Sequence, residues 1–207
     1  MSSPTLPRLI LASGSAYRRE LLQRLQLSFD AVSPDIDETP RPGEAPEATA
    51  LRLAREKAAA VARAHPGALV IGSDQVATLD GIQIGKPGDH ARALAQLQMM
   101  RGRRVVFHTA LCLWDGRLPA DEAAQVENVQ VFVTFRDLPD AELDAYLRIE
   151  QPYDCAGSAK CETLGIALLE AIESADPTAL VGLPLIRTCE LLREAGIDPL
   201  TTPPPTP

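Results

Sequence analysis

The fold of this chain is decided by the stretch Ala68-Leu69-Val70-Ile71-Gly72-Ser73-Asp74-Gln75-Val76. Its apolar run follows Pro66-Gly67 and stops at Gly72, which predicts a strand buried on both faces of a sheet. Asp74 is expected where that strand ends. In open α/β sheets, ligands bind at the carboxyl ends of strands, so Asp74 is a candidate metal ligand or general base. The alternative at this point is an aspartate that only caps a turn.

The composition indicates an ordinary globular protein, with 45% hydrophobic and 23% charged residues in a chain of 207. This length suits one α/β domain, which we expect over residues 8–200, after a flexible start at 1–7 and before a disordered proline-rich tail at 201–207. The net charge of −8 argues against binding to a nucleic acid polymer. No apolar run is long enough for a signal peptide or a membrane span, so we expect no membrane partner and a cytoplasmic location.

Strands and helices are expected along the whole domain. Besides the central stretch, strands are predicted over 8–12, 29–32, 104–114, 126–135, 164–171 and 179–181, together with a hairpin over 76–84. Helices are predicted from Ser15 onward, and then over 45–64, 89–100, 139–149 and 184–195. The alternation of residue types over 126–135 indicates an antiparallel strand with one face buried.

The turn Ser13-Gly14-Ser15 lies between the first strand and the first helix. Such a turn directs backbone N–H groups and hydroxyls at one point, and the positive end of the helix dipole adds to the attraction for an anion. Arg18 and Arg19 follow in the first helical turn, where the dipole alone would favour acidic residues. The stretch therefore predicts a phosphate site, with a solvated arginine-rich helix face as the alternative.

The loop after the second strand carries Asp35, Asp37 and Glu38 and is bounded by prolines. Carboxylate oxygens are the ligands that Mg²⁺ prefers, so this loop is a candidate metal site, and a solvated acidic loop is the alternative. In the long helix that follows, Arg55-Glu56-Lys57 by itself indicates only a charged surface.

Six short motifs occur in an order that is specific when they are taken together. They are Leu11-Ala12-Ser13-x-Ser15-x-x-Arg18-Arg19-x-x-Leu22, Asp37-Glu38, Arg55-Glu56-Lys57-Ala58, Gly72-Ser73-Asp74-Gln75-Val76, Gly85-Lys86-Pro87 and Val181-Gly182-Leu183-Pro184. Through them the chain resembles the Maf-like nucleotide pyrophosphatases from Arg8 to Leu200. Gln75 and the run Cys155-Ala156-Gly157-Ser158-x-Lys160-x-Glu162 resemble the branch that hydrolyses 7-methyl-GTP, although Tyr17 stands where that branch often has tryptophan.

The resemblance implies an α/β fold with an elongated mixed sheet flanked by helices, and two lobes around a deep nucleotide-binding cleft. It implies hydrolysis of a nucleoside triphosphate between the α and β phosphorus atoms, with Mg²⁺ or Mn²⁺ as the cation, and commonly a homodimer. The roles it implies are Asp74 as proton acceptor, Glu38 and Asp74 as metal ligands, Lys57 and Lys86 in catalysis, Ser13, Ser15, Arg18 and Arg19 on the phosphates, and Tyr17, Gln75 and Glu162 on the base.

Physical reasons support these roles. A triphosphate carries about four negative charges near neutral pH, so an acidic protein must gather cationic side chains around it locally. A methylated guanine carries positive charge, which the face of the Tyr17 ring attracts, and the Glu162 carboxylate is expected to accept hydrogen bonds from the guanine edge. Three alternatives stay open: dTTP or UTP as the substrate, a non-standard purine such as ITP or XTP, and a nucleotide-binding regulator of septum formation that no longer hydrolyses.

Overall fold

The computed structural model describes residues 6–202. The expectations of a flexible start at 1–7 and a disordered tail at 201–207 fall mainly on residues that lie outside this range. Within residues 6–202, no helix is long and apolar enough to cross a membrane.

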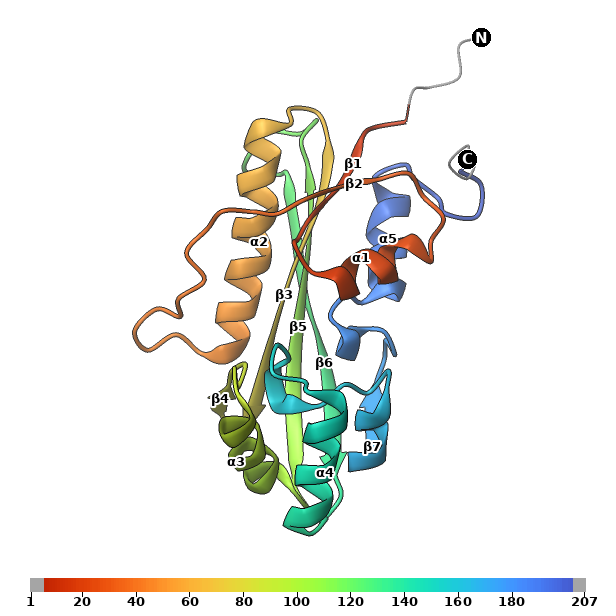
Figure 1. The fold of residues 1–207 in the computed structure, drawn as a ribbon. Helices are drawn as coiled ribbons and strands as arrows, with labels where there is room; N and C mark the ends of the chain where they lie inside the picture. The colour runs from red at the N-terminus through yellow and green to blue at the C-terminus, as the bar shows by residue number, and fades with distance from the viewer. Residues whose placement is uncertain (1–5, 203–207) are drawn as a thin grey trace.

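The described chain forms one sheet with helices packed on it (Figure 1). Its strands are β1 (Leu9–Ala12), β2 (Asp30–Val32), β3 (Leu69–Leu79), β4 (Ile82–Ile84), β5 (Arg104–Asp115), β6 (Ala124–Phe135) and β7 (Leu169–Ser174). Its α-helices are α1 (Ala16–Gln23), α2 (Pro46–Ala64), α3 (His90–Met100), α4 (Asp140–Glu150) and α5 (Leu185–Glu194). Its 3₁₀ segments are η1 (Ala156–Ser158), η2 (Leu164–Leu168) and η3 (Ala179–Val181).

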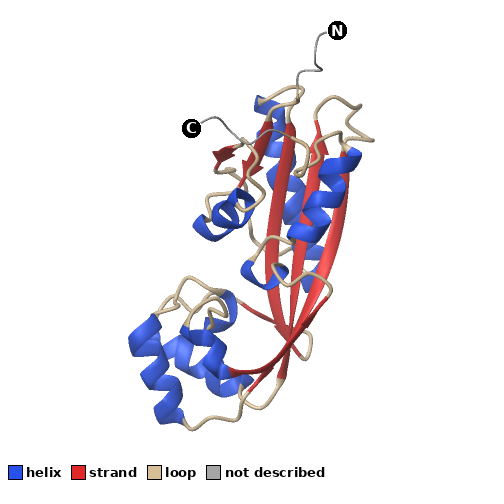
Figure 2. Cartoon of the chain, turned by 90° about the vertical axis from the view of Figure 1, so that its right-hand side faces the viewer, coloured by secondary structure: helices blue, strands red, loops and turns tan. Residues whose placement is uncertain are grey.

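The sheet has the strand order β2-β1-β3-β5-β6-β7, and β4 pairs with β3. β1 is parallel to β2 and β3, whereas β3, β5, β6 and β7 are antiparallel neighbours. The long strands β3, β5 and β6 run the length of an elongated molecule (Figure 1). One end of the sheet carries α1, α2 and α5, here called the first lobe, and the other carries α3 and α4, the second lobe (Figure 1; Figure 2 shows the two ends from the side). The predicted fold class, an α/β fold with an elongated mixed sheet and two lobes, is confirmed.

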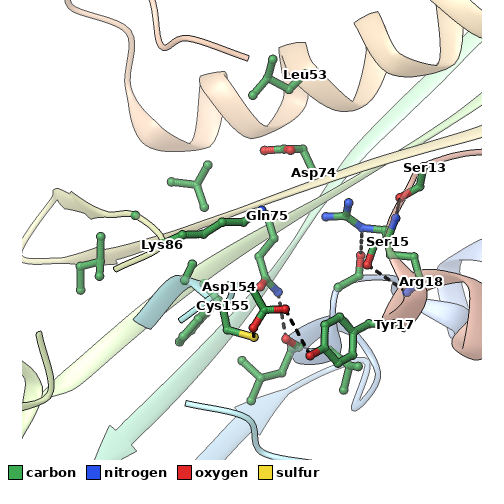
Figure 3. Close-up of a pocket in the computed structure, with 18 of the residues that line it drawn as sticks. Ser13, Ser15, Tyr17, Arg18, Leu53, Asp74, Gln75, Lys86, Asp154 and Cys155 are labelled. Carbon is green, nitrogen blue, oxygen red and sulfur yellow. Dashed lines mark hydrogen bonds between the residues drawn. The ribbon is translucent and has the colours of Figure 1, made fainter. Parts of the chain in front are cut away.

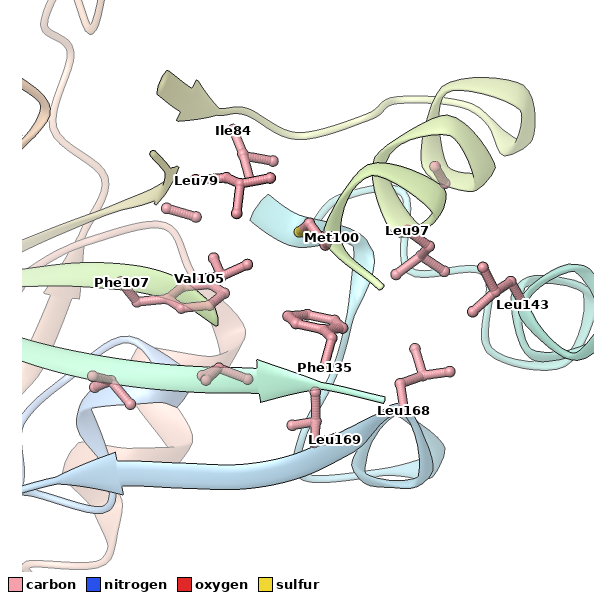
Figure 4. Packing of buried hydrophobic residues seen from close by; sticks show 14 of the residues in the cluster. Leu79, Ile84, Leu97, Met100, Val105, Phe107, Phe135, Leu143, Leu168 and Leu169 are labelled. Atoms are coloured by element: carbon pink, nitrogen blue, oxygen red, sulfur yellow. The ribbon is translucent and has the colours of Figure 1, made fainter. Parts of the chain in front are cut away.

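The predicted burial of the central strand is also confirmed, because β3 is covered on both faces in the first lobe. On one face, Leu69 and Ile71 pack with leucines of α1 and α5 such as Leu21 and Leu192. On the other face, Val70 packs against the alanines of α2. The second lobe has its own apolar core, which includes Leu79, Leu97, Met100, Phe135, Leu143 and Leu168 (Figure 4).

Helix α2 lies close against β3 because its buried face consists largely of alanines. A Cβ on Gly72 would lie 2.2 Å from the carbonyl oxygen of Ala54 and 2.9 Å from Cβ of Ala58. Both distances are far below van der Waals contact, so glycine is required at this point of β3. The close approach brings Lys57, one residue before Ala58, next to the same strand.

The expectation that Asp74 ends its strand was wrong, because β3 continues to Leu79. β1 pairs with β3 only as far as Ala12, which lies opposite Gly72, whereas β5 pairs with β3 as far as Thr78. The antiparallel partner therefore extends the strand after its parallel partner has stopped. Asp74 lies two residues beyond Gly72, where the parallel pairing ends. It therefore lines the same cavity as the turn that follows β1.

In the last third of the chain, the strand predicted over 164–171 is confirmed only for 169–171, and the strand predicted over 179–181 was wrong. The segment Leu164–Leu168 forms η2, and β7 starts only at Leu169. The segment Ala179–Val181 forms η3, and Gly182 after it has a φ of +122°, far from the negative φ of an extended strand. Both segments are short apolar runs, and periodicity alone does not separate a short buried strand from a helical turn.

Candidate functional site

A cavity of about 690 Å³ lies between the two lobes and gathers nearly all of the predicted site residues. Side chains from both lobes point into it (Figure 3). Arg19 does not line it and is exposed on α1, because consecutive residues of a helix point roughly 100° apart. The predicted residues that do line it are Ser13, Ser15, Tyr17, Arg18, Glu38, Lys57, Asp74, Gln75, Lys86 and Glu162.

At the centre of the site, Lys57 of α2 binds two carboxylates. Its Nζ lies 2.7 Å from Oδ1 of Asp74 on β3 and 3.0 Å from Oε2 of Glu38. The side chains of Lys57 and Asp74 are only 6% and 10% exposed, whereas that of Glu38 is 57% exposed. Buried charges are tolerated where they are paired. The Lys57–Asp74 pair therefore forms the floor of the site, and Glu38 faces its open side.

Glu38 and Asp74 also form a donor set that a divalent cation could use. Their carboxylates are close enough to share one ammonium group, and oxygen is the donor that Mg²⁺ and Mn²⁺ prefer. Among residues 6–202, no group of three or more His, Cys, Asp or Glu side chains surrounds a metal position. The residues therefore fit a cation that takes its remaining ligands from phosphate oxygens and water, as Mg²⁺ commonly does.

The turn Ser13-Gly14-Ser15 opens the N-terminus of α1 toward the cavity (Figure 3). Ser15 is the N-cap residue, and its hydroxyl accepts a hydrogen bond from the backbone N–H of Arg18 at 3.4 Å. The hydroxyl of Ser13 accepts one from the N–H of Ser15 at 3.1 Å. Hydroxyls and the first N–H groups of a helix attract anions together, so the geometry of this turn suits a phosphate.

The guanidinium of Arg18 is fixed by a carbonyl group far along the chain. Its Nε donates to the carbonyl oxygen of Gly182 at 2.8 Å, and Oγ of Ser73 donates to the same oxygen at 2.9 Å. Burial lowers the pKa of Arg18, while the charges of Asp74 and Glu38 oppose that change. An arginine in a protein nevertheless stays charged. Because Nε is engaged, binding of a phosphate falls to the two terminal nitrogens.

Gln75 anchors the segment that leads to Gly182. Its Nε2 donates to the carbonyl oxygens of Ala179 and Leu180, both at 3.0 Å, and to Oγ1 of Thr109 at 2.9 Å. These contacts leave Oε1 as the part of Gln75 that a nucleobase could contact. The supporting role of Gly182 is not visible in the sequence, although the motif Val181-Gly182-Leu183-Pro184 that contains it is. Every residue has a backbone carbonyl oxygen, so the residue type does not show which carbonyl accepts such a hydrogen bond.

The two lobes contact each other in the wall of the cavity. The hydroxyl of Tyr17 donates to Oδ2 of Asp154 at 3.5 Å, and Nζ of Lys160 lies 3.6 Å from Oδ1 of Asp154. Nζ of Lys160 also lies 5.9 Å from the centre of the Tyr17 ring, within the range of a cation–π contact. One face of the predicted stacking ring is therefore already next to a cation. Neither Asp154 nor Lys160 was predicted as a site residue.

The second lobe contributes exposed charges and partly buried thiols to the cavity. Lys86 and Glu162 are exposed and line it, and Cys155 and Cys161 lie in its wall. Burial raises the pKa of Cys155 to about 11 and that of Cys161 to about 12. Both thiols are therefore protonated at neutral pH and act as small neutral side chains, not as nucleophiles.

The chain is similar to named proteins over most of its length. Residues 8–195 match a family model described as Maf-like protein. A relative from Cupriavidus metallidurans named 7-methyl-GTP pyrophosphatase is 67% identical and covers 95% of this chain and 97% of its own. A relative of the same name from Ralstonia nicotianae is 69% identical and covers 90% of this chain and 95% of its own. Among solved structures, the Staphylococcus aureus Ham1 protein has a TM-score of 0.44 and 17% identity over 63% of this chain and 72% of that chain.

Proposed function

The chain belongs to the Maf-like protein family, and on that premise we propose that it is a nucleoside triphosphate pyrophosphatase whose preferred substrate is 7-methyl-GTP. Its relatives that are 67% and 69% identical carry the name of that activity. The products of the proposed reaction are 7-methyl-GMP and pyrophosphate. The observation that carries the proposal is the convergence of the buried Lys57–Asp74 pair, the Arg18 guanidinium and the Ser13-Gly14-Ser15 turn on one cavity.

In the proposed complex, positive charges from separate elements surround the triphosphate. The turn before α1 and the guanidinium of Arg18 bind phosphoryl oxygens at the N-terminus of that helix. Lys57 and Lys86 act as point charges along the same row of oxygens. Because the whole chain has a net charge of −8, this local cluster is what makes the binding of an anion favourable.

Water is the proposed nucleophile at the α phosphorus. Asp74 accepts its proton or orients it, and the oxygen Oδ2 is available for this because Oδ1 is bound by Lys57. Lys57 holds the carboxylate in place from α2, so the geometry of the base does not depend on the substrate. Glu38 and Asp74 would hold the divalent cation, which when bound offsets the charge that develops on the departing pyrophosphate.

At the other end of the cavity, we place the guanine base on the Tyr17 ring with its edge toward Glu162. A 7-methylated guanine is positively charged, so both the ring face and the carboxylate favour it over a neutral base. Lys160 lies next to the same ring and must give way when the base stacks there. Nζ of Lys160 lies 3.6 Å from a carboxylate oxygen of Asp154, so Lys160 can move a short distance from the ring and stay paired with Asp154.

A panel of triphosphates at one concentration tests the proposal, with released pyrophosphate measured in the presence of Mg²⁺ or Mn²⁺. We expect 7-methyl-GTP to be hydrolysed fastest and GTP, ITP, UTP and dTTP more slowly. An Asp74→Asn variant serves as the inactive control. A faster rate with UTP or dTTP would contradict the assignment of the base end. Release from none of them would favour the nucleotide-binding regulator that no longer hydrolyses.

A further inference from the structure

The loop that carries Glu38 needs support from outside the cavity. Residues 33–45 join β2 to α2 without forming a helix or a strand. Such long irregular loops in compact domains are usually functional or mobile. The Glu38 side chain is 57% exposed and contacts Lys57 at 3.0 Å. Because Lys57 also binds Asp74 and is proposed to bind phosphate, that single contact does not fix the position of Glu38.

Arg52 of α2 supplies the support through four hydrogen bonds. Its Nε and Nη2 donate to the two carboxylate oxygens of Glu44 at 2.6 and 2.7 Å. Nη2 also donates to the carbonyl oxygen of Thr39 at 3.2 Å, and Nη1 donates to Glu56 at 3.0 Å. The side chains of Arg52 and Glu44 are only 12% and 11% exposed. A bidentate arginine–carboxylate pair of this kind fixes orientation as well as distance.

The two carboxylates that bind Arg52 also bind other residues of the loop and of α2. Glu44 accepts a hydrogen bond from the backbone N–H of Arg41 at 3.0 Å and another from the Thr49 hydroxyl at 2.9 Å. The guanidinium of Arg41 in turn donates to Glu56 at 2.9 Å. The second half of the loop is therefore tied to α2 through a network with Arg52 at its centre.

We propose that Arg52 is a positioning residue for the pyrophosphatase reaction, which holds Glu38 over the Lys57–Asp74 pair through the carbonyl of Thr39 and the carboxylate of Glu44. This inference rests on the proposed function. Arg52 is not among the residues that line the cavity, so it acts through the loop and does not touch the substrate. Lysine at this position would keep the charge but lose the bidentate contact with Glu44, so we expect that it cannot perform the role of Arg52.

A double-mutant cycle between Arg52→Met and Glu38→Gln tests the inference. The readouts are kcat/KM for 7-methyl-GTP and the affinity for Mn²⁺ measured by electron paramagnetic resonance with the non-hydrolysable α,β-methylene analogue of 7-methyl-GTP present. Arg52→Met should lower both about tenfold in the otherwise wild-type protein, as is usual when a residue behind a metal ligand is lost. In the Glu38→Gln protein it should change them less than about twofold. Arg52→Lys should behave like Arg52→Met.

Two measurements separate positioning from general destabilisation. Arg55→Met is the matched control, because Arg55 is exposed on the same helix, and it should leave both readouts unchanged. In Arg52→Met, hydrogen exchange over residues 33–45 should become about tenfold faster while β3 and β5 stay protected. Loss of protection throughout the sheet would overturn the inference, because Arg52 would then be a general stabilising residue.

The outcomes also separate this inference from the proposed function. An equal loss from Arg52→Met in both backgrounds overturns the positioning role and leaves the pyrophosphatase intact. A wild-type protein that neither releases pyrophosphate nor binds Mn²⁺ with the nucleotide overturns both.

Discussion

Nζ of Lys57 lies 2.7 Å from Oδ1 of Asp74, and the elements that carry the two groups pack together at Gly72. The lysine thus joins α2 to β3 through a buried ion pair in the wall of the cavity. Its second partner, Glu38, lies on the open side of the site at 3.0 Å. One ammonium group therefore bridges two carboxylates and reduces the repulsion between them.

Removing that ammonium group should make stability depend on a divalent cation. In Lys57→Met the carboxylates of Glu38 and Asp74 lose the ammonium group that they share, so the melting temperature should fall by several degrees. Millimolar Mg²⁺ should restore part of the loss, since a cation that binds only the native state stabilises it. Thermal unfolding with and without Mg²⁺ measures this, with the wild-type protein as reference. Equal Mg²⁺ shifts in the two proteins would argue against a cation site at these carboxylates.

Adding one methyl group at Gly72 should separate the same two elements. The new Cβ would lie 2.2 Å from the carbonyl oxygen of Ala54, so α2 must move away from β3. We expect Gly72→Ala to lower the free energy of unfolding by about 1–3 kcal/mol, measured by urea denaturation. Gly85→Ala is the matched control, because a Cβ there meets nothing within 4 Å. An unchanged free energy in Gly72→Ala would show that the packing is looser than described.

The ring and the hydroxyl of Tyr17 can be tested separately. Tyr17→Leu removes the ring face, so the preference for 7-methyl-GTP over GTP, taken as the ratio of kcat/KM values, should fall up to about tenfold. Tyr17→Phe keeps the ring and removes only the 3.5 Å contact with Asp154, so the preference should be retained. If Tyr17→Phe lost the preference as fully as Tyr17→Leu, the inter-lobe contact and not the ring would select the base.

Acid should weaken the support of the Glu38 loop in a defined range of pH. The Arg52 guanidinium is the main cause that lowers the pKa of Glu44 from 4.5 to about 2. A carboxyl with a lowered native pKa stabilises the protein above its unfolded pKa, and this stabilisation is lost as the pH falls through the native value. Between about pH 4.5 and 2, the free energy of unfolding should therefore fall less steeply in Arg52→Met than in the wild type. Urea denaturation at a series of pH values measures the slopes, and identical slopes would contradict the assignment.

The central strand could be predicted from the sequence because burial on both faces demands a continuous apolar run, which residues 69–71 supply. The contact between Lys57 and Asp74 could not. It depends on the position of α2 along β3, which is set by the close packing of the helix on Gly72. That packing depends on the shapes of both elements together and not on either segment alone. The end of β3 was misplaced for a similar reason, since its length is fixed by its antiparallel neighbour β5.

Finer features of the site depend on rotation and on the backbone. Arg18 and Arg19 are chemically alike, and only the orientation of α1 decides that Arg18 faces the cavity and Arg19 faces solvent. The carbonyl oxygen that accepts a hydrogen bond from Arg18 belongs to Gly182, and the residue type at that position does not indicate this contact. Asp154 and Lys160 reach Tyr17 only because the second lobe folds back against the first, a contact across 137 positions of sequence for Asp154.

The measurement that tests the central claim most directly is the hydrolysis of 7-methyl-GTP in H₂¹⁸O by the wild-type protein and by Asp74→Asn. Attack of water at the α phosphorus predicts one ¹⁸O atom in 7-methyl-GMP and unlabelled pyrophosphate. The rate should be at least about 100-fold lower in Asp74→Asn, because the group that accepts or orients the proton is lost. Label in orthophosphate, or equal rates for the two proteins, would contradict the claim that Asp74 directs cleavage between the α and β phosphorus atoms.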